Sequence, residues 1–285
     1  MTGLYIGVNG VPKKIKKMYV GVNGISKKIK KGYIGINGIP KLFYQDSILP
    51  EDYQQVEYIR NSGYTQYINP GNIYPDSDTT VYIKYVAKAR KSSSSGGKLF
   101  GYDVRGYSNS YPYKSGSYLN YYYYLETDNY NYNRFGRYIY PSGDSSQYSY
   151  INFSSGIGTL NKMNEILYNE PGGNFYENGT KKQTVTVTFS NENMWNWNQT
   201  ASWKPRLIIL GMMEIESGNG SAIITPADVE YELYQCSVWQ SGNQIRDMYP
   251  CYRKSDNVIG MYDIVGKTFY TNAGSGTFYK GPNKS

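Results

Sequence analysis

The 285-residue sequence predicts an all-β protein, in which a small N-terminal module of β-hairpins precedes an antiparallel β-sandwich or jelly roll. Three observations lead to this prediction. Residues 5–42 contain a 14-residue repeat with an Asn-Gly pair in each copy, residues 53–279 alternate between short apolar and polar runs, and helical periodicity is almost absent. We expect a module for anchoring or oligomerisation at residues 1–47 and the sandwich at residues 48–285.

The repeat begins at Tyr5, Tyr19 and Tyr33, with the sequences YIGVNGVPKKIKKM, YVGVNGISKKIKKG and YIGINGIPKL. Each copy places Asn-Gly between two short apolar runs. This is typical of a two-residue type I′ turn, because both central residues need positive φ. A single two-stranded hairpin is only marginally stable in water. We therefore expect the three hairpins to stack or to self-associate, with a trimer as the expected homo-oligomer.

Beyond residue 47, runs with a period of two residues predict half-buried antiparallel strands. The continuous apolar stretch 207–213 predicts a central strand covered on both faces, and a small helix is expected near 225–228. The SSSSGG segment at 92–97 is interpreted as a flexible hairpin tip. The expected strands include residues 80–87, 98–102, 118–125, 137–140, 148–153, 184–189, 206–214, 229–239, 245–249, 258–262 and 268–270.

Positive charge is concentrated in the repeat. The net charge is +8, but residues 1–41 contain nine lysines and no acidic residue, which leaves 21 basic against 22 acidic residues in 42–285. The lysines could guard a solvated edge against aggregation, dock on an acidic protein surface or contact nucleic acid, and we do not expect nucleic acid. The candidate docking lysines are Lys13, Lys14, Lys16, Lys17, Lys27, Lys28, Lys30 and Lys31.

The composition excludes several site chemistries. There is no histidine, so His-dependent nucleophiles and every His-containing zinc or non-haem iron site are absent. Cys236 and Cys251 flank a hairpin whose turn lies near 241–243. This places Cys236 opposite residues 247–249 and predicts two reduced, half-buried thiols. We expect no cofactor and no metal, with a calcium contribution left open because carboxylate oxygens could hold it.

The sequence contains neither the apolar core of a secretory signal at its N-terminus nor a run approaching the ~18 apolar residues of a membrane helix. We therefore expect no export by the usual route and no membrane insertion, which leaves release by lysis.

Tyrosine dominates the candidate binding residues. Residues 102–150 contain 15 tyrosines among Ser, Asn and Gly, a composition that suits recognition because tyrosine gives rigid amphipathic contact area. Alternate tyrosines of 118–125 could instead point into the sandwich. Two tryptophans at 195 and 197 could form a sugar-binding ledge, or one ring could close the end of the core. The candidate ligand-binding residues are Tyr121, Tyr122, Tyr123, Tyr124, Tyr130, Tyr132, Trp195, Trp197 and Trp203.

Three segments carry a resemblance to a known family: LPEDYQQVEYIRNSGYTQYINPG at 49–71, KLFGYDVRG at 98–106 and VEYELYQCSVWQSGNQIRDMYPCYRKSDNVIGMYDIVGKTFYTNAGSGTF at 229–278. Over roughly residues 49–279 the chain resembles the concanavalin A-like, laminin-G-type jelly-roll domain, which is widespread in bacteriophage and prophage structural proteins. The lysine-rich VNG repeat is similar to one in phage tail-associated proteins. The resemblance implies a virion component whose sandwich faces outward and whose hairpins dock on other virion proteins.

Glucanases of the concanavalin A-like fold carry a Glu-Ile-Asp…Glu pattern that resembles Glu214-Ile215-Glu216. Alternate residues of a strand lie about 7 Å apart on one face, so this pair suggests a retaining glycosidase. The chain departs from the pattern, because Glu216 replaces Asp and residues 217–219 supply no third carboxylate. We therefore expect no catalytic residues and no enzyme.

The sequence thus yields one leading hypothesis, a tail-fibre or head-fibre type of virion structural protein whose lectin-like sandwich adheres to host-surface glycan. Two alternatives remain: a purely architectural capsid or tail decoration protein without its own ligand, and a glycan-cleaving enzyme. The sequence leaves the host, the glycan and the place on the virion open.

Overall fold

The computed structural model describes residues 5–8, 11–14, 18–29, 31–36, 39–45, 48–75, 78–91, 97–105, 118–125, 133–138, 148–153, 160–170, 173–184, 206–215 and 222–284. These residues form strands, turns and loops, and no helix occurs among them, which confirms the predicted all-β class. The prediction of a small helix near 225–228 is wrong. Residues Ala222–Pro226 form strand β19, whose backbone pairs with β18 and so is committed to a sheet.

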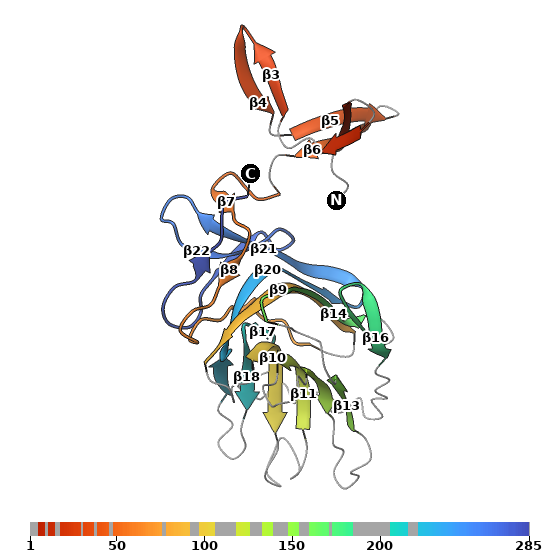
Figure 1. Cartoon of the computed structure of the whole chain (residues 1–285), viewed down its shortest axis with the longest axis vertical. Coiled ribbons are helices and arrows are strands. Elements are labelled where there is room, and N and C mark those ends of the chain that lie inside the picture. The colour runs from red at the N-terminus through yellow and green to blue at the C-terminus, as the bar shows by residue number, and fades with distance from the viewer. Residues whose placement is uncertain are drawn as a thin grey trace.

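The N-terminal repeat forms three hairpins, each a two-stranded sheet of its own (Figure 1). In register, Val8 lies opposite Val11, Val22 opposite Ile25 and Ile36 opposite Ile39. At the second loop Asn23 has φ 52° and Gly24 has φ 76°, as the predicted type I′ turn requires. The strands are β1 (Tyr5–Val8), β2 (Val11–Lys14), β3 (Met18–Val22), β4 (Ile25–Ile29), β5 (Lys31–Ile36) and β6 (Ile39–Gln45).

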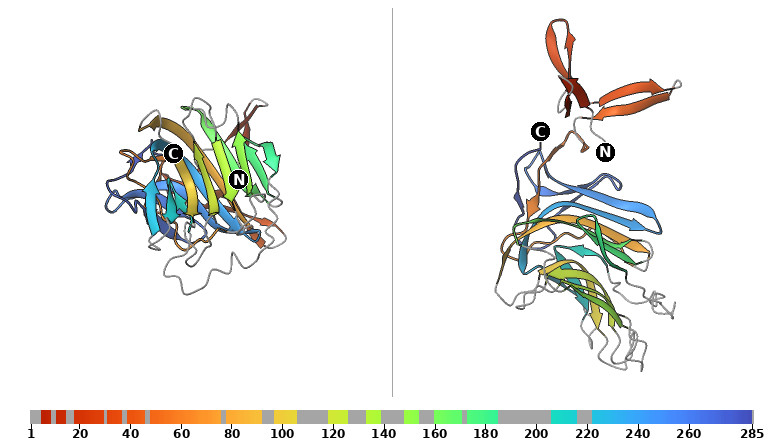
Figure 2. Two further views of the ribbon diagram at one scale, coloured as in Figure 1. Left: turned by 90° about the horizontal axis from the view of Figure 1, so that it is seen from below. Right: turned by 45° about the vertical axis from the view of Figure 1, so that its right-hand side comes forward.

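The remaining described strands form two sheets that pack face to face as a sandwich (Figures 1 and 2). The small sheet has the order β13-β12-β11-β10-β18-β19, with β17 paired to β10. Its strands are β10 (Gly97–Arg105), β11 (Tyr118–Leu125), β12 (Asn133–Tyr138), β13 (Tyr148–Phe153), β17 (Ile208–Ile209), β18 (Gly211–Ile215) and β19 (Ala222–Pro226).

The large sheet has the order β16-β15-β14-β9-β20-β21-β22-β23, and the short strands β7, β8 and β24 join it through β21, β20 and β8. Its strands are β7 (Tyr53–Gln55), β8 (Ile59–Arg60), β9 (Thr79–Arg90), β14 (Met163–Glu170), β15 (Asn174–Glu177), β16 (Thr180–Thr184), β20 (Val229–Gln240), β21 (Asn243–Arg253), β22 (Ile259–Asp263), β23 (Thr268–Thr271) and β24 (Tyr279–Lys280).

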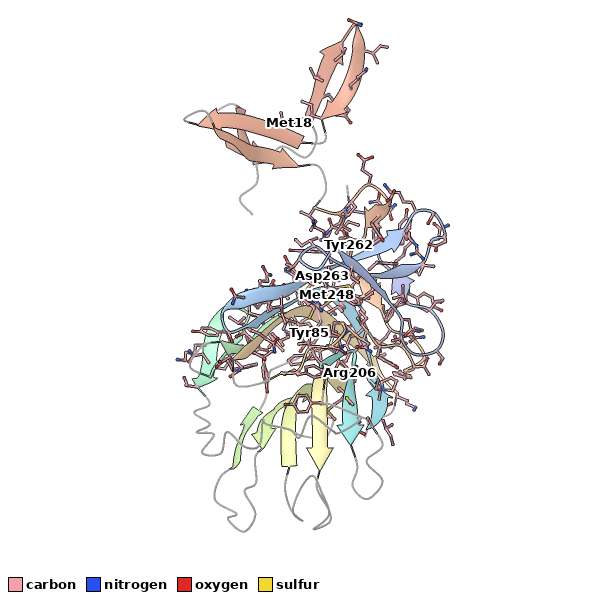
Figure 3. The ribbon with its side chains drawn as sticks, turned by 180° about the vertical axis from the view of Figure 1, so that it is seen from behind. Met18, Tyr85, Arg206, Met248, Tyr262 and Asp263 are labelled. Atoms are coloured by element: carbon pink, nitrogen blue, oxygen red, sulfur yellow. The ribbon has the colours of Figure 1, made fainter. Side chains whose placement is uncertain are left out.

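The hydrophobic core lies between the two sheets, and tyrosine fills much of it. Tyr85, Tyr102, Tyr168 and Tyr231 are the largest fully buried side chains, and Tyr85 is labelled between the layers in Figure 3. The Phe100 ring of β10 meets the Tyr168 ring of β14 edge-on at 5.3 Å, which joins the small sheet to the large one. Part of the tyrosine surplus therefore builds the core and not a surface.

Buried phenols need hydrogen-bond acceptors, and backbone carbonyls supply them. The hydroxyl of Tyr231, on the large sheet, donates to the carbonyl of Gly97 on the small sheet at 2.9 Å. The hydroxyl of Tyr102 donates to the carbonyl of Pro75 at 3.0 Å. A phenylalanine core could not make these links, so tyrosine ties the layers together as well as filling them.

Two further expectations are corrected by the pairing. The apolar stretch 206–214 is not one strand: Leu210 has φ 60°, and the chain reverses there from β17, antiparallel to β10, to β18, parallel to β10. The Leu210 N–H donates to Leu99, and its carbonyl accepts from Ala227, which holds this unusual backbone in place. Residues 92–97 do not join a hairpin, because β9 lies in the large sheet and β10 in the small one.

Candidate recognition surface

The tyrosine-rich strand predicted at 118–125 is β11, between β10 and β12 in the small sheet. Tyr121 pairs in register with Tyr102, and Tyr123 pairs with Phe100. The side chains of Tyr121, Tyr122, Tyr123 and Tyr124 lie outside the described part of the chain, as do residues Tyr130, Tyr132, Trp195, Trp197 and Trp203 entirely. Recognition through these residues stays a prediction.

A second tyrosine-rich surface, not found from the sequence, lies on the outer face of the large sheet. In β20 the side chains of Tyr231 and Leu233 enter the core, so Glu232 takes the opposite face. A bulge at Tyr234 shifts the register between Leu233 and Gln235. We call the set on this side of the sheet the outer row: Glu232, Tyr234, Gln235 and Ser237 of β20, with Asp247 and Tyr249 of β21. Glu232, Ser237 and Asp247 are buried, and the other three are half-buried.

One half of the outer row centres on the carboxylate of Asp247. The Ser237 hydroxyl donates to Asp247 Oδ1 at 2.8 Å, and Gln235 Nε2 donates to the same oxygen at 3.1 Å. The Tyr249 hydroxyl donates to Asp247 Oδ2 at 3.2 Å and accepts from Gln235 Nε2 at 3.0 Å. These bonds link the polar side chains of β20 and β21 across the sheet.

The other half centres on the carboxylate of Glu232, which is only 6% exposed. The Tyr234 hydroxyl donates to Glu232 Oε2 at 3.1 Å, and Lys88 Nζ of β9 lies 3.8 Å from Oε1. The ring of Tyr58 lies beside the ring of Tyr234, with centroids 5.4 Å apart. Two phenol rings and a lysine therefore surround one carboxylate.

The phenols of this surface stay protonated at neutral pH. Burial and the neighbouring Glu165 raise the pKa of Tyr82, on β9, to about 12. Burial and Asp247 raise the pKa of Tyr249, while burial and Glu232 raise the pKa of Tyr58 and Tyr234. Protonated phenols beside carboxylates offer O–H donors, acceptors and ring faces, a combination that suits binding of a polyhydroxylated ligand and provides no activated nucleophile.

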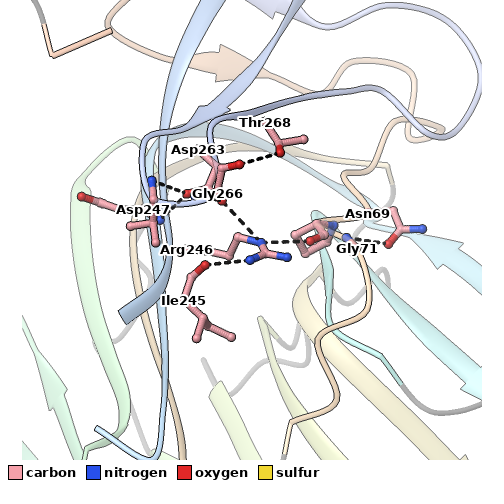
Figure 4. Close-up of polar contacts among 10 residues, drawn as sticks. Asn69, Gly71, Ile245, Arg246, Asp247, Asp263, Gly266 and Thr268 are labelled. Carbon is pink, nitrogen blue, oxygen red and sulfur yellow. Dashed lines mark hydrogen bonds and ion pairs between the residues drawn. The ribbon is translucent and has the colours of Figure 1, made fainter. Parts of the chain in front are cut away.

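A buried ion pair supports the outer row from beneath (Figure 4). Asp263 is fully buried, and its Oδ1 accepts from the backbone N–H groups of Asp247 at 2.9 Å and Val265 at 3.1 Å. Its Oδ2 accepts from the Gly266 N–H at 3.0 Å and lies 3.5 Å from Arg246 Nε, which also donates to the Pro70 carbonyl. Asp263 thereby fixes the backbone that carries Asp247.

The carboxylates suspected of catalysis are not assembled as a pair among the described residues. Glu214 of β18 forms an ion pair with Lys98 of β10, and its Oε2 accepts from the Thr225 hydroxyl at 2.8 Å. Glu216 lies outside the described residues. Within the described ranges, no group of three or more His, Cys, Asp or Glu residues could hold a metal ion.

Both cysteines are free, as predicted, and Cys236 pairs in register with Met248, within the predicted range. They are fully buried and not half-buried, and they belong to different hydrophobic clusters. Burial raises the pKa of Cys236, and it raises the pKa of Cys251 to about 12, so both thiols are protonated at neutral pH.

The candidate docking lysines distribute over the hairpins. Lys13 and Lys14 lie in β2, Lys27 and Lys28 in β4, and Lys31 in β5. Lys27 is exposed, whereas Lys16, Lys17 and Lys30 lie outside the described residues. None of the described residues forms a helix that is long and apolar enough to span a membrane.

The described geometry defines a β-sandwich with a tyrosine- and carboxylate-lined outer face. No protein-family model matches the chain, and none of the curated proteins matches its sequence. Among solved structures, the chain is similar to the crystal structure of Scytalido-glutamic peptidase with a peptide based transition state analog. The identity is 13% and the TM-score 0.25, over 73% of this chain and 89% of that chain. A TM-score of this size supports no conclusion about the activity of this chain.

Proposed function

We propose that this protein is a bacteriophage virion structural protein whose concanavalin A-like jelly roll adheres to host-surface glycan. The family resemblance over residues 49–279 supports the virion assignment, and the two-sheet sandwich agrees with it. The hairpins, with nine lysines in residues 1–41, attach the protein to other virion proteins or assemble it, with a trimer as the expected oligomer. In this proposal the protein is made in the host cytoplasm, released by lysis and displayed on the capsid or tail surface.

The observation that carries the glycan assignment is the pair of phenol rings where Tyr58 lies against Tyr234 of the outer row. Tyr58 and Tyr234 place two phenol rings side by side next to the Glu232 carboxylate. Aromatic faces stack on the apolar C–H face of a sugar, and the phenol hydroxyls can exchange hydrogen bonds with sugar hydroxyls. The tyrosines of β11 provide a second candidate surface on the other sheet. Binding through either surface needs no reaction, metal or cofactor.

One observation favours the architectural alternative, a decoration protein without its own ligand. The polar groups of the outer row already satisfy one another, since Asp247 accepts from Ser237, Gln235 and Tyr249. A network of this kind also stabilises a sheet that binds nothing. The glycan hypothesis and this alternative therefore differ only in whether a ligand exists.

A glycan array probed with the full-length protein distinguishes them. We expect binding to a subset of host-surface carbohydrates, and no binding to any of them even at high avidity would refute adhesion. The pair Tyr58→Ala and Tyr234→Ala should weaken binding at least about tenfold with little change in melting temperature. The matched control is Tyr74→Ala, an exposed tyrosine outside the outer row.

One further double variant and one incubation extend this test. The pair Trp195→Ala and Trp197→Ala asks the same question of the predicted tryptophan ledge. Incubating the protein with the best-bound glycan should give no shortened products, and shortened products would show that the protein is an enzyme.

A further inference from the structure

An arginine lies beside the phenol pair of the proposed glycan site. Strand β8 pairs with β20 on one side and with β24 on the other, so Arg60 stands opposite Glu232 and opposite Tyr279. Cross-strand partners share a face of a sheet. Arg60 therefore lies on the side of the large sheet that carries the outer row, between the buried carboxylate of Glu232 and the exposed ring of Tyr279.

The charge of Arg60 reaches the phenols of this site. Burial and the neighbouring Glu232 raise the pKa of Tyr58, with a smaller contribution from the exposed Glu57. Arg60 acts on the same pKa in the opposite direction, so its guanidinium lies close to Tyr58. The ring of Tyr58 in turn lies beside the ring of Tyr234. One cation and two phenols therefore lie together on the outer side of the sheet.

The Arg60 guanidinium is held by a ring and keeps unpaired donors. Its Cζ lies 5.5 Å from the centroid of the Tyr279 ring, and Tyr279 is 55% exposed. Its Nε is buried without a hydrogen-bond partner, and no hydrogen bond or ion pair joins its terminal nitrogens to any residue that the structure describes. The ring restricts the plane of the guanidinium, so the N–H groups are oriented before a ligand binds.

The carboxylate opposite Arg60 in register does not neutralise it. Glu232 Oε2 accepts from the Tyr234 hydroxyl at 3.1 Å, and Oε1 lies 3.8 Å from Lys88 Nζ. Both carboxylate oxygens therefore have partners other than Arg60. A half-buried cation with an unsatisfied donor costs free energy, and an anion from outside the chain would offset that cost.

We propose that Arg60 binds the acidic group of an acidic glycan, either a carboxylate or a phosphate, while a sugar ring lies on Tyr58 and Tyr234. The planar guanidinium matches the oxygen geometry of both groups and can donate two parallel hydrogen bonds to them. A neutral sugar offers only hydroxyls, which do not compensate the charge. This inference rests on the proposed glycan adhesion and adds the charge of the glycan, which the aromatic rings do not specify.

The test is an array that carries each acidic oligosaccharide beside a neutral form of the same sugar sequence. Uronic-acid oligosaccharides are paired with their methyl esters, and phosphorylated oligosaccharides with their dephosphorylated forms. We expect the full-length protein to bind an acidic member at least about tenfold more tightly than its neutral form. The kind of pair that shows this preference identifies the acidic group as a carboxylate or a phosphate.

The lysines of residues 1–41 also attract anions, so a variant must locate the site. Arg60→Gln should weaken binding of the acidic member at least about tenfold and binding of the neutral form less than about threefold. The matched control is Lys280→Gln, which removes the same charge from the opposite face of β24. Lys280 pairs with Ile59 and lies 4.9 Å from the centroid of the Tyr252 ring. The control should change binding of both forms less than about threefold.

A second variant separates recognition from folding. Arg60→Lys keeps the charge but not the planar fork, and we expect the same selective loss at a smaller size. A loss on acidic and neutral forms alike in both variants would show that Arg60 only supports the fold, which overturns the proposal. Equal or tighter binding of the neutral forms, or acidic binding unchanged by Arg60→Gln, also overturns it but leaves glycan adhesion intact. No binding to any member of the array refutes both.

Discussion

Val238 of β20 and Val20 of β3 both lie in antiparallel strands, but their surroundings differ completely. Val238 is fully buried between two sheets, whereas Val20 is 46% exposed on a two-stranded hairpin. Among the described residues, a second sheet therefore covers the core face of β20, whereas β3 pairs with β4 in a two-stranded sheet of its own. The comparison teaches that a local sequence pattern specifies a strand, while contacts with a second sheet decide whether its apolar side chains are buried.

The largest expected effect comes from opening the core of the sandwich. Phe100→Ala removes the ring that joins β10 to Tyr168 of β14, and we expect a loss of about 3–5 kcal/mol in the free energy of unfolding. Val20→Ala on the hairpin should change it by less than about 0.5 kcal/mol in dilute solution. Denaturant unfolding of both variants checks this difference, and equal losses would show that the hairpin belongs to the same cooperative unit.

A smaller effect is expected at the buried ion pair. Asp263→Asn keeps the shape but turns an NH₂ group toward backbone N–H donors, which leaves part of the network of Asp247, Val265 and Gly266 unsatisfied. We expect a loss of about 2–3 kcal/mol, measured by chemical unfolding. Asp256→Asn, at an exposed ion pair with Arg253, is the control and should leave the midpoint unchanged. A neutral Asp263→Asn variant would contradict the supporting role given to this carboxylate.

The smallest effect concerns alkaline pH. The pKa of Tyr82 is raised from 10 to about 12 by burial and Glu165, so the folded protein retains a proton that the unfolded chain has lost. This contribution to stability is fully present below pH 10 and is lost as the pH rises from 10 to 12. Tyr82→Phe should flatten the fall of the unfolding midpoint over that interval. An unchanged pH profile in the variant would show that Tyr82 is not protected in the folded state.

Strong local patterns predicted strands and turns well. The bounds of Tyr118–Leu125 and Tyr148–Phe153 agree with the expected strands, and Asn23-Gly24 adopts the expected turn. Both features depend on neighbouring residues alone. The strand Met163–Glu170 was missed, because its mixture of Asn, Glu and apolar residues has only a weak period of two.

Features decided by distant contacts could not be predicted. The reversal at Leu210 depends on hydrogen bonds to Leu99 and Ala227, far away in the sequence. The outer row depends on the bulge at Tyr234, which changes the residues that face outward. The alternation of Glu232 and Tyr234 with core residues was the signal available for this surface. Many other segments of the chain are also rich in polar residues, so this alternation did not stand out.

Hydrogen exchange of the full-length protein at low and high concentration tests the central claim most directly, by comparing the amides of Val229–Gln240 with those of residues 18–29. We predict that β20 is protected at both concentrations, because its second layer lies within the chain. The amides of β3 and β4 should exchange rapidly in dilute solution and become protected as copies associate. Hairpin protection that is already strong in dilute solution and independent of concentration would contradict the account.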